Sequence, residues 1–169
     1  LDLDGFPDLN TIPGELRISE NRSLARLDGL ESLVEIAGDL RLEDNPALQS
    51  LGALGGLVRL GEDFFVARNN ALESFAGLEK LGTIEESLFV DENRALGSLA
   101  GLSALVTVGE NLRIAGNDAI AALSGADQLT SVGRDLLIVG NSSLASLDGM
   151  EKLSSVGRIL RITENPSLS

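Results

Sequence analysis

The chain has 169 residues, 43 % of them hydrophobic, which is enough for one domain with a buried core, so disorder is not expected. Its 13 basic and 26 acidic residues give a formal net charge of -13, which argues against nucleic acid or an anionic membrane surface as a partner and favours a basic one. The absence of Cys and His excludes disulfides, thiolate metal sites and a His-based active site. No signal peptide is visible, and no run of about 18 apolar residues could span a bilayer.

A repeat with a period of 24 residues runs through the whole chain. Residues 1–13 match the second half of an incomplete first unit, and full registers follow. Apolar residues recur five and three residues before an Asn, as Leu88 and Val90 do before Asn93. The Asn column consists of Asn21, Asn45, Asn69, Asn93, Asn117, Asn141 and Asn165. A glycine column has the same period, at Gly29, Gly77, Gly101, Gly125 and Gly149, with Ala53 as its one substitution.

This pattern predicts a solenoid, because one turn cannot bury its apolar side chains alone, whereas stacked turns bury them in a shared core. Alternation of inward and outward residues predicts one short strand in each turn, and about seven such strands would stack as a parallel sheet. In chain order these strands are expected at 16–18, 40–42, 64–66, 88–90, 112–114, 136–138 and 160–162. The stretches between them are expected to be turns, short strands or single helical turns.

The Asn column is interpreted as a structural ladder. An Asn amide both donates and accepts hydrogen bonds, so it can satisfy backbone groups where the strand turns inward and pair with the Asn of the adjacent turns. Asn21 and Asn141 also match the glycosylation sequon, but a ladder position buries the amide, so these matches are expected to be by-products of the repeat.

The repeat, written LxIxxNxxLxxLxGLxxLxxI, resembles a leucine-rich repeat of the 24-residue kind. Its longer turn, between Ile84 and Leu88, is similar to that of receptor L domains and related bacterial surface repeats. The resemblance covers residues 3–168. It implies a right-handed leucine-rich-repeat solenoid of α/β type, mostly β, as a single domain over 1–169. It also implies recognition of a protein or another ligand at a cell surface or outside the cell, with no catalytic residues and no cofactor. Neither end shows a polar cap, which predicts a piece of a longer array or ends covered by a partner, such as a second copy.

The outward strand positions are the candidate ligand-binding surface. Those directly after the first inward residue of each strand are Arg17, Arg41, Phe65, Phe89, Arg113, Leu137 and Arg161. The same face is expected to include the residues directly before the first inward residue, which are Glu15, Asp39, Asp63, Ser87, Asn111, Asp135 and Ile159. Phe65, Phe89, Leu137 and Val139 are expected to form an apolar patch that Arg113 interrupts and Asp91 borders, and such patches often mark interaction sites. Two interpretations stay open: a site for a protein or peptide, or stacked side chains that merely support the sheet. A homodimer through Phe65 and Phe89 is the corresponding alternative function, as part of a larger surface protein.

Other columns favour structural interpretations. The acids before each Asn, such as Glu20 and Asp44, recur as calcium ligands would, but Arg68, Gly116 and Gly140 interrupt them, so a solvated rim is favoured over a metal site. Aligned Ser and Thr residues are better explained by turns than by binding of ice or carbohydrate. No catalytic motif such as GxSxG or a phosphate loop is present, so an enzyme is not expected.

Overall fold

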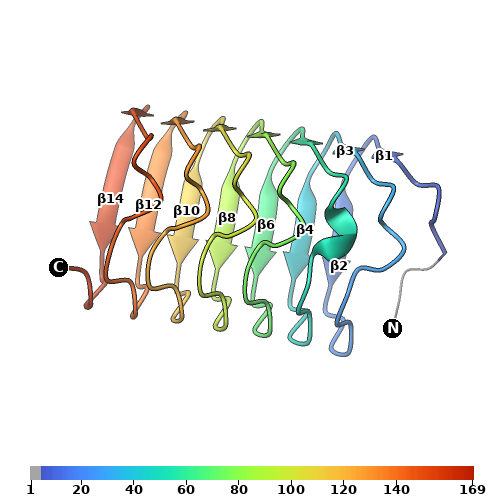
Figure 1. Cartoon of the computed structure of the whole chain (residues 1–169), viewed down its shortest axis with the longest axis horizontal. Coiled ribbons are helices and arrows are strands. Elements are labelled where there is room, and N and C mark those ends of the chain that lie inside the picture. Colours follow the sequence, from blue (N-terminus) through green and yellow to red (C-terminus); the bar gives the residue numbers. More distant parts are fainter. Residues whose placement is uncertain (1–4) are drawn as a thin grey trace.

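Residues 5–169, which the computed structural model describes, form a β-solenoid of about 6 turns with a spacing of about 24 residues (Figure 1). Residues 1–4, which belong to the incomplete first unit expected over 1–13, lie outside the described part. Each turn contributes one long strand and one strand of two residues, and the connecting segments lie in front of the long strands in Figure 1. The prediction of a mostly β solenoid without a long helix is confirmed.

The long strands make one parallel sheet of 7 strands in the order β14-β12-β10-β8-β6-β4-β2. Register holds every strand at the same place in its turn, as Phe65 pairs with Phe89 and Phe89 with Arg113. The strands are β2 (Leu16–Ser19), β4 (Leu40–Glu43), β6 (Phe64–Ala67), β8 (Leu88–Asp91), β10 (Leu112–Ala115), β12 (Asp135–Val139) and β14 (Ile159–Thr163).

The two-residue strands make a second parallel sheet of 7 strands, where the sequence predicted one sheet. A two-residue strand is too short for a period of two to be recognised, so only the pairing between turns reveals it. These strands are β1 (Thr11–Ile12), β3 (Glu35–Ile36), β5 (Arg59–Leu60), β7 (Thr83–Ile84), β9 (Thr107–Val108), β11 (Ser131–Val132) and β13 (Ser155–Val156).

The core is one continuous column of aliphatic side chains between the two sheets and the connecting segments. On the long strands the inward residues are almost completely buried; Leu88 is 1 % exposed and Val90 is 0 % exposed. The two Phe residues inside the core, Phe64 and Phe75, meet edge to face with their ring centroids 6.2 Å apart. None of the helices over residues 5–169 is long and apolar enough to cross a membrane.

The Asn ladder is present and connects all successive turns. From Asn45 onward, the Oδ1 of each Asn accepts the backbone N–H of the Asn one turn earlier; Asn69 N–H donates to Asn93 Oδ1 at 2.9 Å. Each Nδ2 from Asn45 onward donates to a carbonyl 27 residues earlier, as Asn93 Nδ2 does to Val66 O at 2.8 Å. The interior ladder residues are 0 % exposed. Because Asn141 is one of them and uses its amide in the ladder, its sequon is inaccessible.

The glycine column marks a position that a side chain cannot occupy. Gly101 has φ of +107°, and a Cβ there would lie 2.0 Å from Phe75 O of the previous turn. Ala53 takes this place in one turn, and there the backbone adopts a short 3-10 helix instead, η1 (Gly52–Leu54). An L-residue avoids a φ near +107°, so the local structure changes rather than the residue being forced into the glycine conformation.

Candidate ligand-binding face

The outward side of the seven long strands forms a surface that we call the open face. Its central column follows the strand order from Arg17 to Arg161, because parallel pairing in register places residues 24 apart side by side. The seven candidate residues are all half-buried and lie on the five middle strands; they are Arg41, Phe65, Phe89, Asp91, Arg113, Leu137 and Val139.

Phe65 and Phe89 form a parallel stack at the middle of the open face. Their ring centroids are 4.7 Å apart and their planes differ by 10°. The guanidinium of Arg41, on the strand at the other side of β6, lies 3.8 Å from the centroid of the Phe65 ring, a cation–π contact. Both faces of Phe65 are therefore covered by neighbouring turns, and its ring presents mainly its edge to a ligand.

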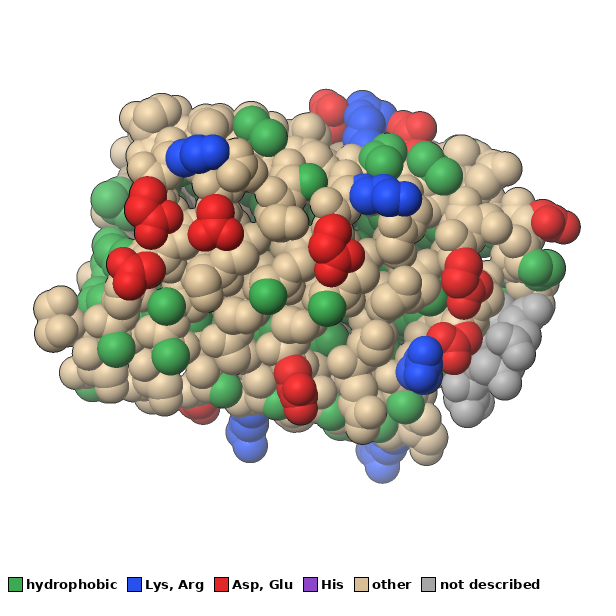
Figure 2. Space-filling model, viewed as in Figure 1, with side chains coloured by type: hydrophobic (Ala, Val, Ile, Leu, Met, Phe, Trp, Pro, Cys, Tyr) green, Lys and Arg blue, Asp and Glu red, His purple; other side chains and the backbone are tan. Residues whose placement is uncertain are grey.

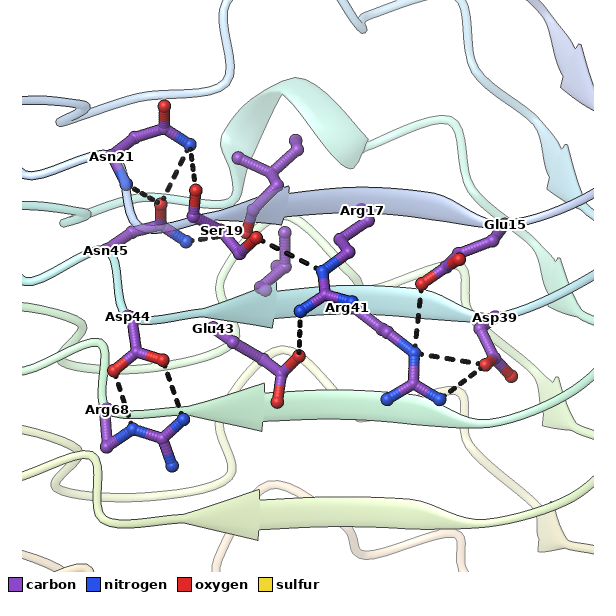
Figure 3. Close-up of polar contacts among 12 residues, drawn as sticks. Glu15, Arg17, Ser19, Asn21, Asp39, Arg41, Glu43, Asp44, Asn45 and Arg68 are labelled. Carbon is purple, nitrogen blue, oxygen red and sulfur yellow. Dashed lines mark hydrogen bonds and ion pairs between the residues drawn. The ribbon is translucent and has the colours of Figure 1, made fainter.

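Carboxylates hold the arginines at the N-terminal end of this face (Figure 3). Arg41 pairs with Asp39 at 2.7 Å and with Glu15 at 3.0 Å, while Arg17 lies 3.9 Å from Glu43. Although burial lowers the pKa of Arg41, its hydrogen bond to Asp39 and the nearby acids raise it overall. Arg41 is thus fixed over Phe65 by Asp39 of its own turn and Glu15 of the preceding turn.

Arg113 and Asp91 form an ion pair beyond the phenylalanine stack. Burial raises the pKa of the Asp91 carboxyl, and Arg113 offsets this only in part. One oxygen, Oδ1, is buried and has no hydrogen-bond partner among the described residues. A buried acceptor without a partner is costly, so Asp91 is the least satisfied polar group of the open face.

Leu137 and Val139 extend the apolar surface on β12, in register with Arg113 and Ala115. Arg113 therefore stands between them and the phenylalanine stack. The stack is one compact anchor, and the two aliphatic residues form a separate area farther along the solenoid.

A second polar ladder lies at the start of the long strands. Asp63 N–H donates to Asp39 Oδ1 at 3.0 Å, and Ser87 N–H donates to Asp63 Oδ1 at 2.8 Å. The prediction that this column belongs to the open face is wrong for Ser87 and Asp135, which are only 3 % and 7 % exposed. The signal that the sequence offered was a short Asp, Asn or Ser at this position in several successive turns, since such side chains bond readily to nearby backbone N–H groups.

Three glutamates one residue before this ladder form what we call the acidic ridge: Glu62, Glu86 and Glu110. Glu110 N–H donates to Glu86 O at 2.8 Å, so these residues lie on adjacent turns. Burial raises the pKa of Glu86, and the charges of Asp63, Glu110 and Glu62 raise it further. The same position holds Gly or Arg in the other turns, so three acids among seven turns do not stand out as a column of the repeat.

A shallow groove of about 560 Å³ lies at the other end of the long strands, beside the Asn ladder. At its centre Arg68 makes two hydrogen bonds of 2.7 Å to the carboxylate of Asp44 (Figure 3), which lower the pKa of Asp44. Its lining residues are Glu20, Arg22, Asp44, Pro46, Arg68, Asn70, Glu92 and Arg94. The residue before each Asn has positive φ, for example +55° at Arg68, and this explains why Gly takes the same place at Gly116 and Gly140.

The side formed by the connecting segments differs from the open face. Figure 2, which views this side, shows acidic and basic side chains scattered among polar and backbone atoms, with hydrophobic side chains in small separate spots. The stacked aromatic pair lies on the long strands, on the opposite side of the solenoid. Comparison of the chain with family models, with curated proteins and with solved structures gives no match.

Proposed function

We propose that this protein is a non-catalytic recognition module of the leucine-rich-repeat type that binds a protein or peptide through its open face. The observation that carries the proposal is the stack of Phe65 and Phe89 at the middle of that face. The resemblance of the repeat to receptor L domains and bacterial surface repeats supports a location on or outside a cell as part of the proposal.

The stack has the properties of a binding anchor. Leaving two aromatic rings half-exposed forgoes part of the free energy that their burial would contribute, roughly 25 cal/mol for each Å² of apolar surface. The rings are held in place by each other and by Arg41, so a ligand would lose little free energy in ordering them. Rigid aromatic and arginine side chains near the centre of a surface dominate binding energies in many complexes.

The geometry also restricts the ligand. A flat ring that stacks on an aromatic face finds no free face on Phe65, because Phe89 and Arg41 cover both sides. The ring edges instead fit aliphatic side chains or the faces of other aromatic rings, which prefer edge contacts. Protein side chains meet this requirement.

Self-association through the same face is the alternative function. When two copies meet face to face with their solenoids aligned parallel or antiparallel, the two-fold axis lies in the contact plane, along either the solenoid or the strands. Centred on the phenylalanine stack, the first axis sets Arg41 opposite the partner's Arg41, and the second sets it opposite the partner's Arg113. Both arrangements bring like charges together, which favours a foreign ligand over a second copy.

Selection from a displayed library of random peptides tests the proposal. Peptides are selected for binding to the wild-type protein. Peptides that also bind the Phe65→Ser/Phe89→Ser variant are discarded, because they bind elsewhere on the protein. We expect enriched peptides to bind the variant at least about a hundredfold more weakly, the loss typical of two anchor residues. Light scattering on both proteins supplies the mass, and a wild-type dimer that becomes a folded monomer in the variant would instead establish self-association.

The matched control is Val34→Ser/Val58→Ser. These two residues are each 42 % exposed and precede the short strands, away from the open face. Enriched peptides should bind this control as they bind the wild type. If peptides bind the Phe65→Ser/Phe89→Ser variant as tightly as the wild type but bind the control more weakly, the binding site lies on another surface.

A further inference from the structure

We infer that the ligand of the open face is a cationic peptide segment, with an apolar side chain on the edges of Phe65 and Phe89 and Lys or Arg side chains on the acidic ridge. This inference rests on the proposed function and names the chemistry of its ligand. It combines the aromatic anchor with the charge of the ridge on the same turns of the solenoid.

The ridge lies close to the anchor along each turn. Glu62 and Glu86 each stand three residues before a phenylalanine of the stack, at the turn that leads into β6 and β8. Three extended residues cover at most roughly 10 Å. An extended peptide spaces alternate side chains by about 7 Å, so one side chain can contact the rings while the next long cationic side chain reaches the ridge.

Two of the three ridge charges, those of Glu62 and Glu86, are not neutralised by a cation in the described part of the chain. Over residues 5–169 no ion pair includes Glu62 or Glu86, whereas Glu110 pairs with Arg134 at 3.4 Å. Burial is the larger cause of the raised pKa of the Glu86 carboxyl, and repulsion from neighbouring carboxylates raises it further. A ligand cation between these glutamates would relieve that repulsion.

The two cations on either side of the phenylalanine stack already have carboxylate partners. Arg41 is bound by Asp39 and Glu15, and Arg113 is bound by Asp91. An acidic ligand would have to displace these carboxylates, and it would also approach a chain with a net charge of -13. Charge complementarity therefore selects a basic ligand over an acidic one and over a second copy of this chain.

Isothermal titration with short synthetic peptides tests the inference on the whole protein. The probes repeat Leu-Ser-Lys-Ser, Leu-Ser-Glu-Ser and Ser-Ser-Lys-Ser, and we call them the Leu–Lys, Leu–Glu and Ser–Lys peptides. In an extended peptide this spacing puts the Leu and the charged side chain on the same side. We expect the Leu–Lys peptide to bind best, because it alone supplies both the apolar contact and the cations. Its affinity should fall as salt increases, since the ridge is exposed to solvent.

Two variants separate the parts of the site. Glu62→Gln/Glu86→Gln/Glu110→Gln should weaken the Leu–Lys peptide by about tenfold and reduce its salt dependence. The control Asp8→Asn/Glu73→Gln/Asp127→Asn removes three exposed charges from connecting segments outside the ridge. It should leave the affinity within about twofold, because solvent and salt screen exposed charges that do not contact the peptide. The folds of all variants are compared by circular dichroism and thermal unfolding.

The outcomes distinguish this inference from the proposed function. If the ridge variant binds as the wild type does, or if both triple variants lose the same affinity, the ridge is not the cation site and the inference fails. If the Leu–Glu peptide binds best and loses affinity in Phe65→Ser/Phe89→Ser, the open face still binds peptides and only the basic class is wrong. If the Phe65→Ser/Phe89→Ser variant binds every peptide as the wild type does, the proposed function fails as well.

Discussion

The inward and outward residues of one strand follow different rules, as β8 shows. Leu88 and Val90 point inward and are 1 % and 0 % exposed, and every other long strand has an aliphatic or Phe residue at the same two places. Phe89 and Asp91 point outward and are half-buried, and the corresponding places hold Arg, Phe or Leu and Ser, Glu, Ala, Val or Thr. The inward residues share one environment because each turn packs on the next, whereas the outward residues are free to differ.

This contrast separates what builds the solenoid from what the solenoid displays. A side chain that repeats in every turn, such as the ladder Asn, supports the stacking of turns. A side chain that occurs in only two or three turns, such as those of the phenylalanine stack or the acidic ridge, has no role that every turn requires. Such exceptions to the repeat are the places to look for function.

Breaking the ladder should have the largest effect. Asn93→Ala removes the acceptor for Asn69 N–H and the donor to Val66 O, and it leaves both backbone groups buried without partners. We expect a loss of about 2 to 6 kcal/mol in the free energy of unfolding, measured by urea denaturation. Asn70→Ala, at an exposed position one residue after the ladder, should cost less than about 1 kcal/mol. Equal losses would contradict the structural role of the ladder.

One substitution on each side of β8 tests the difference between inward and outward residues. Leu88→Ala should cost about 2 to 5 kcal/mol, because it leaves a cavity in the core. Phe89→Ser should cost only about 1 to 2 kcal/mol, because it removes a half-exposed ring and its stacking contact. Chemical denaturation of the two variants measures both, and a larger loss for Phe89→Ser would show that the stack is mainly structural.

The glycine column gives a third comparison, within the connecting segments. Gly101→Ala should cost about 2 to 4 kcal/mol, because its φ is +107° and its Cβ would meet Phe75 O. Gly97→Ala, where a Cβ meets nothing within 4 Å, should be neutral or stabilising by up to about 1 kcal/mol. Thermal unfolding of the two variants tests this. A tolerated Gly101→Ala would indicate that this turn rearranges as the turn at Ala53 does.

The smallest effects are expected for two carboxylates, Asp44 and Asp91, whose substitution should change the pH dependence of the stability in opposite directions. The pKa of Asp44 is lowered in the folded protein, so its contribution to stability is present above its unfolded pKa and is lost as pH falls through the folded pKa. Asp44→Asn should therefore destabilise the protein at neutral pH, by about 0.5 kcal/mol for a partly exposed pair, and the difference should vanish in acid.

Asp91 should show the opposite trend. Burial raises its pKa in the folded protein, so the folded state binds this proton more readily than the unfolded state, and ionisation at higher pH weakens the fold. Relative to the wild type, Asp91→Asn should become more stable as pH rises from acid to neutral. Urea denaturation between acid and neutral pH measures both variants, and parallel trends would contradict the assigned environments.

The sequence by itself determined the solenoid, its period and the inward or outward direction of most long-strand residues. These features follow from the alternation of inward and outward residues within each turn and from the recurrence of Asn and Gly every 24 residues. Both patterns are visible in the sequence without knowledge of the contacts between turns. The positions of Phe65, Phe89 and Arg113 on one outward face could be predicted for the same reason.

Only the tertiary structure decided which neighbours these residues meet. The stacking of Phe65 on Phe89, the choice of Asp39 and Glu15 as partners of Arg41, and the acidic ridge all depend on contacts between turns. The second sheet depends on them too, since its strands are only two residues long. A repeat shows that residues 24 apart lie side by side, but the rotamers, the ion pairs and the degree of burial are settled by packing among three or more turns at once.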